Sequence, residues 1–112
     1  MKELKYCCYN IKHGCYFEFQ KGDFFIEEKH WLESSLFIDE AIVNELNLGP
    51  LFCKAIPDFN YFGPTKITKD QWLAVKEMSN DMTAQIKNAI NEIDEWAQNC
   101  FLTENCFSIC GI

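Results

Sequence analysis

Seven cysteines and two histidines are the residues of this chain whose types most often carry out nucleophilic or metal chemistry. A nucleophilic cysteine needs a histidine as its base, and a zinc site is usually built from paired ligands such as Cys-x2-Cys. That spacing does not occur. His13 precedes Cys15 by two residues and Cys106 precedes Cys110 by four, but neither pair forms half of a recognised site. With His30 as the only other histidine, the sequence predicts no metal ligand and no catalytic thiol.

The cysteines are better explained as small hydrophobic residues of a core. Their number is odd, and the N-terminal stretch MKELKYCCYN lacks the apolar segment of a signal peptide, so no disulfide framework is predicted. All except Cys53 lie in or beside apolar or aromatic runs. We therefore expect free thiols in a chain that stays in the cytosol. The cysteines are Cys7, Cys8, Cys15, Cys53, Cys100, Cys106 and Cys110.

Carboxylates could serve as general acids and bases if two of them converged in a pocket. The neighbours Glu27-Glu28 and Asp39-Glu40 would point to opposite sides of an extended chain, and Asp94-Glu95 falls on a predicted helix, mostly away from its apolar stripe. Two histidines support no credible Ser-His-Asp arrangement, and no glycine-rich loop could cradle phosphate. We predict no enzymatic activity and no cofactor.

Charge is the strongest signal in the composition. Seventeen acidic residues stand against ten lysines, there is no arginine, and the formal net charge is −7. The segment Glu18–Glu45 alone holds eight acids and two lysines. An acidic field attracts basic partners and repels nucleic acid and anionic membranes, although net charge also simply keeps a small domain soluble. No segment reaches the roughly 18 uncharged apolar residues of a membrane span. We predict neither a nucleic-acid nor a membrane partner.

The first quarter of the chain predicts a β meander. Leu4–Ile11 and Cys15–Gln20 read as strands joined by the turn Lys12-His13-Gly14, and Lys21-Gly22 then turns the chain into a third strand, Phe24–Glu28. Apolar and polar residues alternate along Cys15–Gln20, which predicts one buried face and one polar face.

The middle of the chain gives weaker signals. Leu36–Ile38 is compatible with a short strand. Ser35 or Asp39 could cap a helix that runs to about Leu46 and is stopped by Asn47 and Gly49-Pro50. The following Leu51–Ile56 is too short to assign.

Pro57–Pro64 is predicted to be an irregular loop with unusually many aromatic residues. The favoured interpretation is a lid whose rings pack onto the core. The alternative is an exposed contact patch, because Tyr and Phe supply much of the energy at interfaces.

The sequence then predicts one long helix, from Lys69 to about Gln98, without Gly or Pro. Thr68 and Gln71 form a capping box at its start, and Ser79-Asn80-Asp81 could bend or break it. Apolar residues recur along it at three- and four-residue steps and should face the sheet. Those expected on the buried side include Trp72, Met82, Ile86, Ile93 and Trp96.

Cys106–Ile112 reads as a final strand that joins the meander's sheet. The predicted fold is a single α+β domain over residues 1–112. An antiparallel sheet of four to five strands, made of the N-terminal meander and the C-terminal strand, lies under one long helix with a shorter helix at the rim.

This arrangement resembles the bacterial immunity proteins of polymorphic toxin and contact-dependent growth inhibition systems. The resemblance lies in the acidic meander, the late helix with Trp72 and Trp96, and the ending Cys-Phe-Ser-Ile-Cys-Gly-Ile. The stretch Asn-Tyr-Phe-Gly-Pro-Thr-x-Ile-Thr-x-x-x-Trp adds to it. It implies a small cytosolic antidote that binds one cognate toxin domain, often a basic nuclease, and it transfers no individual residue.

We therefore predict an acidic patch that docks a basic protein, with the aromatic loop as the second candidate surface. Two alternatives stay open: an adaptor module that binds a protein through its sheet edge or aromatic loop, and a small cysteine-dependent or metal-binding protein. A monomer or a dimer is expected. The predicted partner-binding residues are Asp23, Glu27, Glu28, Glu33, Asp39, Glu40, Tyr61 and Phe62.

Overall fold

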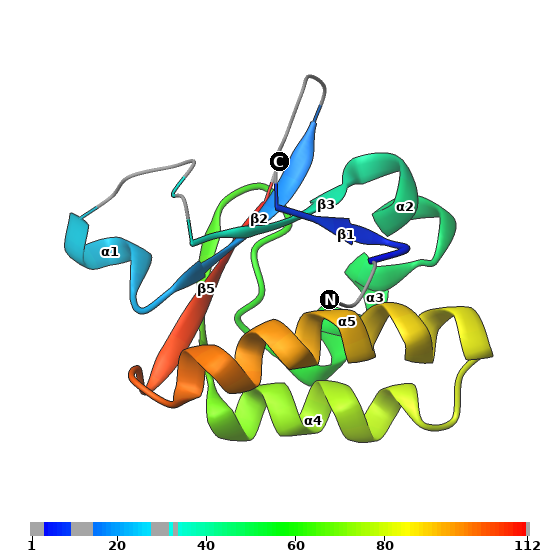
Figure 1. Cartoon of the computed structure of the whole chain (residues 1–112). Helices are drawn as coiled ribbons and strands as arrows, with labels where there is room; N and C mark the ends of the chain where they lie inside the picture. Colours follow the sequence, from blue (N-terminus) through cyan, green and yellow to red (C-terminus); the bar gives the residue numbers. More distant parts are fainter. Residues whose placement is uncertain (1–3, 10–14, 28–31, 33, 112) are drawn as a thin grey trace.

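The computed structural model describes residues 4–9, 15–27, 32 and 34–111, and these form the predicted α+β fold (Figure 1). One five-stranded antiparallel sheet is accompanied by five helices within the described residues. The elements are β1 (Cys7–Cys8), β2 (Tyr16–Lys21), α1 (Phe24–Glu27), β3 (Leu36–Asp39), α2 (Glu40–Glu45), α3 (Leu48–Ala55), β4 (Pro64–Thr68), α4 (Lys69–Ser79), α5 (Ala84–Phe101) and β5 (Cys106–Cys110).

The strand order in the sheet is β1-β3-β2-β5-β4. The final strand β5 joins the sheet, as the sequence predicted, and takes an interior place between β2 and β4. The predicted sequential meander is wrong in its pairing, because β1 pairs with β3 and not with β2. The turn proposed at Lys12-His13-Gly14 lies outside the described residues.

The predicted third strand, Phe24–Glu28, is a short helix instead, and its last residue, Glu28, lies outside the described residues. Gly22 reverses the chain with φ of 83°, a left-handed conformation that glycine adopts without steric cost. Asp23 then accepts a hydrogen bond from the backbone N–H of Phe25 at 2.9 Å and so starts α1. The local capping interaction and the glycine turn outweigh the β propensity of the two phenylalanines.

The second predicted helix divides in two. Asp39 caps α2, which was one of the two caps that the sequence predicted. Just after α2, Asn47 adopts φ of 55°. Gly49-Pro50 does not stop the helical region, because both residues lie in the first turn of α3. Proline is tolerated there, since an N–H in the first turn would have no partner inside the helix.

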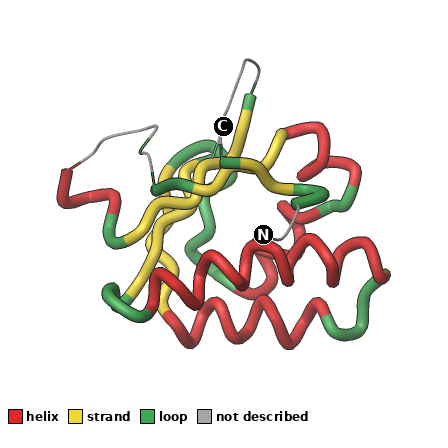
Figure 2. The backbone as a smooth tube through the Cα atoms, in the orientation of Figure 1, coloured by secondary structure: helices red, strands yellow, loops and turns green. Residues whose placement is uncertain are grey.

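The long helix is also two helices, α4 and α5, which run side by side in opposite directions along one side of the sheet (Figures 1 and 2). The capping box of Thr68 and Gln71 begins α4 as predicted. The break follows Ser79, where a break was considered, and Thr83 caps α5. Because Met82 lies in the connection, it is 37% exposed rather than buried, and Ile86 is half-buried.

The aromatic loop leads directly into a strand that the sequence did not predict. β4 pairs with β5 along its whole length, from Pro64 opposite Cys110 to Thr68 opposite Cys106. Before it, the rings of Phe59 and Tyr61 pack against Phe17, as the lid interpretation predicted.

The main core lies between the sheet and the helices. It is built from one face of the strands, where Phe17, Phe19, Phe107 and Ile109 are fully buried, together with apolar residues of α2 to α5. The helical residues with the deepest burial include Val43, Leu48, Phe52, Trp72, Val75, Ala89, Ile90, Ile93 and Ala97.

Candidate functional site

The predicted acidic residues that the structure describes do not form one patch. In the antiparallel pair of β2 and β3, Asp39 lies opposite Tyr16, whereas Asp23 follows the far end of β2. Five strand steps of about 3.3 Å put roughly 17 Å between the two ends of β2. Glu28 and Glu33 lie outside the described residues. The structure thus divides the remaining acids between the two ends of the sheet.

Asp39 and Glu40 sit at one end, where their local role is in the helix α2. The Oδ1 atom of Asp39 accepts a hydrogen bond from the N–H of Ala41 at 2.7 Å. Glu40 follows as the first helical residue, where negative charge favours the helix dipole. Helix capping therefore accounts for both residues without a partner.

Tyr61 and Phe62 belong to this same end. The hydroxyl of Tyr61 donates to Asn44 Oδ1 at 2.9 Å, which ties the loop to α2. Its ring meets that of Phe17 edge-on, with 5.2 Å between centroids. Phe62 is 77% exposed and is the member of the pair that is available for contact.

Glu18 is not on the surface, although the sequence predicts a polar face there. Its side chain is buried, and its Oε2 accepts hydrogen bonds from the N–H of Leu32 at 3.0 Å and the hydroxyl of Ser35 at 2.7 Å. The carboxylate thus ties Leu32 and Ser35, in the connection between β2 and β3, to the sheet. Burial of such a group is tolerated because it is hydrogen-bonded.

Ser108 fastens the start of the same connection. Its hydroxyl accepts a hydrogen bond from the N–H of Phe24 at 2.8 Å and donates one to the carbonyl of Gly22 at 2.9 Å. Gln20 is buried beside it, opposite it in the ladder of β2 and β5. The second face of the sheet thus carries a buried polar layer.

The other end of the sheet presents a surface of mixed charge around α1, where Lys21 lines the same hollow as two carboxylates. Phe25 is 56% exposed and Ile26 is 79% exposed. Asp23 and Glu104 line the same shallow hollow of about 200 Å³ as Ile26. We call Asp23, Phe25, Ile26 and Glu104 the α1 surface. Figure 1 places α1 at the periphery, apart from α4 and α5.

The two carboxylates of the α1 surface act on the same neighbour. Burial raises the pKa of the Cys106 thiol, Lys66 opposes that shift, and the charges of Asp23 and Glu104 add to it. Lys66 Nζ lies 4.0 Å from Asp23 Oδ2, on a half-exposed side chain. Because Asp23 already has this partner, Glu104 is the acid that is freer to meet a new one.

Of the sequence-predicted residues, Asp23 belongs to the α1 surface, and Glu27 ends the helix that carries it. Glu104 was not predicted. Glu104 comes close to Asp23 because β2 pairs with β5. In this pairing Phe107 lies opposite Lys21, so the turn before β5 lies next to Asp23. No short-range pattern reveals a contact between positions that far apart.

The cysteines lie mostly in the interior. Cys7, Cys100, Cys106 and Cys110 are buried, whereas Cys15 and Cys53 are exposed. Burial, with the charge of Glu18 nearby, raises the pKa of Cys110 to about 12. Among the described residues, no cluster of three or more His, Cys, Asp or Glu could hold a metal ion. His13 and His30 lie outside that part of the chain.

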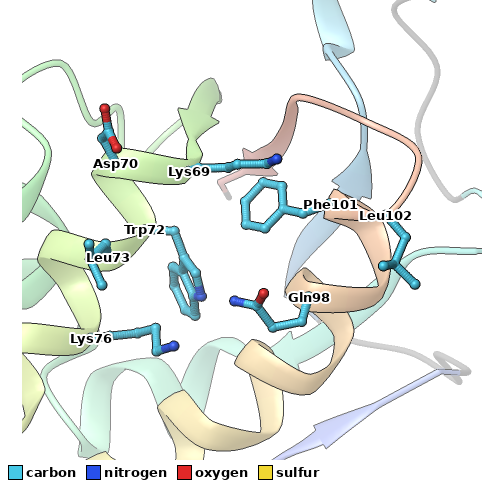
Figure 3. A pocket seen from close by; sticks show the side chains of 8 residues that line it. All are labelled: Lys69, Asp70, Trp72, Leu73, Lys76, Gln98, Phe101 and Leu102. Atoms are coloured by element: carbon cyan, nitrogen blue, oxygen red, sulfur yellow. The ribbon is translucent and has the colours of Figure 1, made fainter.

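A second hollow, of about 340 Å³, lies between the start of α4 and the end of α5 (Figure 3). Its apolar walls are Trp72, Leu73, Phe101 and Leu102, and its polar lining residues are Lys69, Asp70, Lys76 and Gln98. The lining residues come from two segments, 69–76 and 98–102, which the packing of α4 against α5 brings together.

Comparison of the chain with protein-family models, curated proteins and solved structures found no match. Over the described residues, no helix combines the length and the apolar character that crossing a bilayer would need.

Proposed function

We propose that this protein is a cytosolic immunity protein, which binds and neutralises a cognate toxin domain of basic charge, such as a nuclease, through the α1 surface. The observation that carries the proposal is that two neighbouring apolar side chains, Phe25 and Ile26, are well exposed, and that the carboxylates of Asp23 and Glu104 line the same hollow as Ile26.

This combination suits an interface with a basic protein. Exposed apolar side chains that are flanked by polar groups are typical of protein-binding sites, and a buried aromatic anchor often supplies much of the binding energy. Acidic groups at the rim raise the association rate with a basic partner, since the chain carries a net charge of −7. A nuclease domain that holds nucleic acid would present the matching positive surface.

The sheet edges favour the α1 surface over strand addition as the binding mode. β4 is an edge strand that starts with Pro64 and exposes Lys66, and both features discourage pairing with another strand. The opposite edge, β1, has two residues. The carboxylate of Glu92 holds it by accepting the N–H groups of Lys5, Tyr6 and Cys7 at 2.9 to 3.0 Å.

The proposal is tested by co-expression with the neighbouring gene product. The C-terminal domain of a large secreted protein encoded directly upstream would be produced in a bacterial host with and without this chain. We expect the domain alone to arrest growth and the chain to restore it. A harmless domain, or a metabolic operon at that place, would contradict the proposal and favour an adaptor role.

The binding surface is tested in the same assay with the double variant Phe25→Ser, Ile26→Ser. We expect it to lose protection while the protein stays folded, because both side chains are exposed. The control is Phe62→Ser, at an even more exposed aromatic residue at the other end of the sheet. Protection that is lost only in the control would move the interface to the aromatic loop.

A further inference from the structure

The hollow between α4 and α5 has no role in the interface proposed above. Its rim is open to solvent and combines apolar side chains, Leu73 at 50% and Leu102 at 80% exposed, with the exposed Lys69 and Asp70. Its volume of about 340 Å³ lies at the lower end of the range of small-molecule pockets, roughly 300–1,000 Å³. A pocket of this size accommodates a compact ligand rather than a folded domain.

One wall of the hollow is fixed by a hydrogen-bond network around Asp94. The carboxylate accepts from Trp72 Nε1 at 2.8 Å and Gln98 Nε2 at 3.0 Å, and Lys76 Nζ lies 3.2 Å away. Partial burial alone would raise the pKa of Asp94, but the interactions with Gln98, Trp72 and Lys76 outweigh it and hold the pKa below its usual value. Asp94 is therefore ionised, and it neutralises Lys76.

Lys69 is a second lysine of the hollow, and it does not take part in the network around Asp94. Its Nζ lies 5.7 Å from the centroid of the Phe101 ring at the mouth of the hollow (Figure 3). The neighbouring Asp70 also lines the hollow, but its carboxylate lies on the side away from the Phe101 ring in the same view. Within the part of the chain that the structure describes, no ion pair involves Lys69. An ammonium beside aromatic and aliphatic walls fits the negative end of an amphipathic ligand.

Gln98 sets the orientation of such a ligand. Because its amide nitrogen donates to Asp94, its carbonyl oxygen is left as the acceptor that faces the hollow. A carboxylate would be repelled by this oxygen and attracted by Lys69. The Gln98 oxygen and Lys69 together direct the carboxylate of a ligand to the Lys69 end of the hollow.

We propose that the α4–α5 hollow binds a small apolar monocarboxylate, with its carboxylate at Lys69 and its ring or branched chain between Leu73, Phe101 and Leu102. The protein as a whole is acidic and Asp70 lines the same hollow, yet the charge beside the Phe101 ring is the positive charge of Lys69.

The proposal is tested by NMR titration of the full chain with 3-phenylpropionate up to about 10 mM, since weak binding is expected for so small a ligand. We expect saturable shifts of the Trp72 indole N–H and of amides in α4 and α5. The neutral analogue 3-phenylpropionamide should bind about tenfold more weakly, because it lacks the charge-assisted contact. Shifts that never saturate, or that spread over the surface, would overturn the proposal.

Lys69→Gln provides the decisive variant, and Lys54→Gln, an exposed lysine of α3, is its matched control. We expect Lys69→Gln to weaken the carboxylate about tenfold and to leave the amide unchanged. Equal affinities in the two variants would refute the role of Lys69. Because Lys69 is not part of the α1 surface, toxin neutralisation should survive in Lys69→Gln, so that the two proposals can fail independently.

Discussion

The two faces of the central sheet are closed in different ways. On the face toward the helices, Phe19 and Phe107 are buried among aromatic and aliphatic side chains. On the other face, the alternate residues Glu18 and Ser108 are equally buried but form hydrogen bonds with Leu32 and Gly22, in the connection between β2 and β3. The alternation of residues along a strand therefore predicts which face is apolar, but not whether the other face meets water.

The difference has an energetic consequence. Burial of a large apolar side chain contributes roughly 1.5–3 kcal/mol, whereas a hydrogen bond contributes a net of about 1 kcal/mol. We expect the helical face to set global stability. The connection that carries α1 should open more readily, which places the proposed interface in the less stable part of the molecule.

The largest effect is expected at Phe107, whose ring contacts those of Phe19, Trp72, Trp96 and Phe101. Phe107→Ala should lower the free energy of unfolding by about 3–5 kcal/mol, because it leaves a cavity in the core. Urea denaturation measures this change in the free energy of unfolding. Phe62→Ala, at an exposed phenylalanine, should change stability by less than about 0.5 kcal/mol. Similar values for the two variants would contradict the assignment of the core.

A smaller effect is expected on the other face. Glu18→Ala should cost about 1–3 kcal/mol, since it leaves the N–H of Leu32 and the hydroxyl of Ser35 without their acceptor. Hydrogen exchange at Leu32 should speed up more than exchange in α5. Glu45→Ala, at an exposed glutamate, is the control. If Glu18→Ala were neutral, this face would be open to water, as the alternation alone suggests.

The smallest effect concerns Asp94 and depends on pH. Because its pKa is lowered in the folded protein, it contributes stability above its unfolded pKa near 3.8, and that contribution is lost as pH falls through the lower folded value. Asp94→Asn should therefore destabilise the protein near neutral pH, by less than about 1 kcal/mol for this partly exposed group. The difference from the parent should vanish in strong acid. A difference that is independent of pH would show that packing, not charge, is lost.

Much of the fold was predictable because its signals are local. The capping box at Thr68, the strands around Phe17 and Leu36 and the final strand from Cys106 follow from patterns within a few residues. β4 was missed, since Pro64 and the polar residues after it resemble a loop until β5 lies beside them. α1 was misread because a glycine turn and an aspartate cap outweighed β propensity.

The candidate surface was less predictable, because charge counted along the sequence does not say where side chains meet. Asp23 and Asp39 belong to the same acidic segment but lie at opposite ends of β2 and β3. Glu104, more than eighty residues beyond Asp23, completes the α1 surface through the pairing of β2 with β5. Only the sheet order supplies that contact.

The most direct test of the central claim compares the two ends of the sheet in one binding measurement. Asp23→Asn with Glu104→Gln removes two charges from the α1 surface, while asparagine can still cap α1. Asp39→Asn with Glu40→Gln removes two charges at α2, where the asparagine at position 39 can likewise cap the helix. Affinity and association rate of each pair for the cognate toxin domain would be measured at low and high salt.

We expect the α1 pair to slow association by several-fold at low salt and to flatten the salt dependence, as rim charges do. The α2 pair should behave like the parent protein. An unchanged rate and salt dependence in the α1 pair, or a larger loss in the α2 pair, would contradict the placement of the interface at α1.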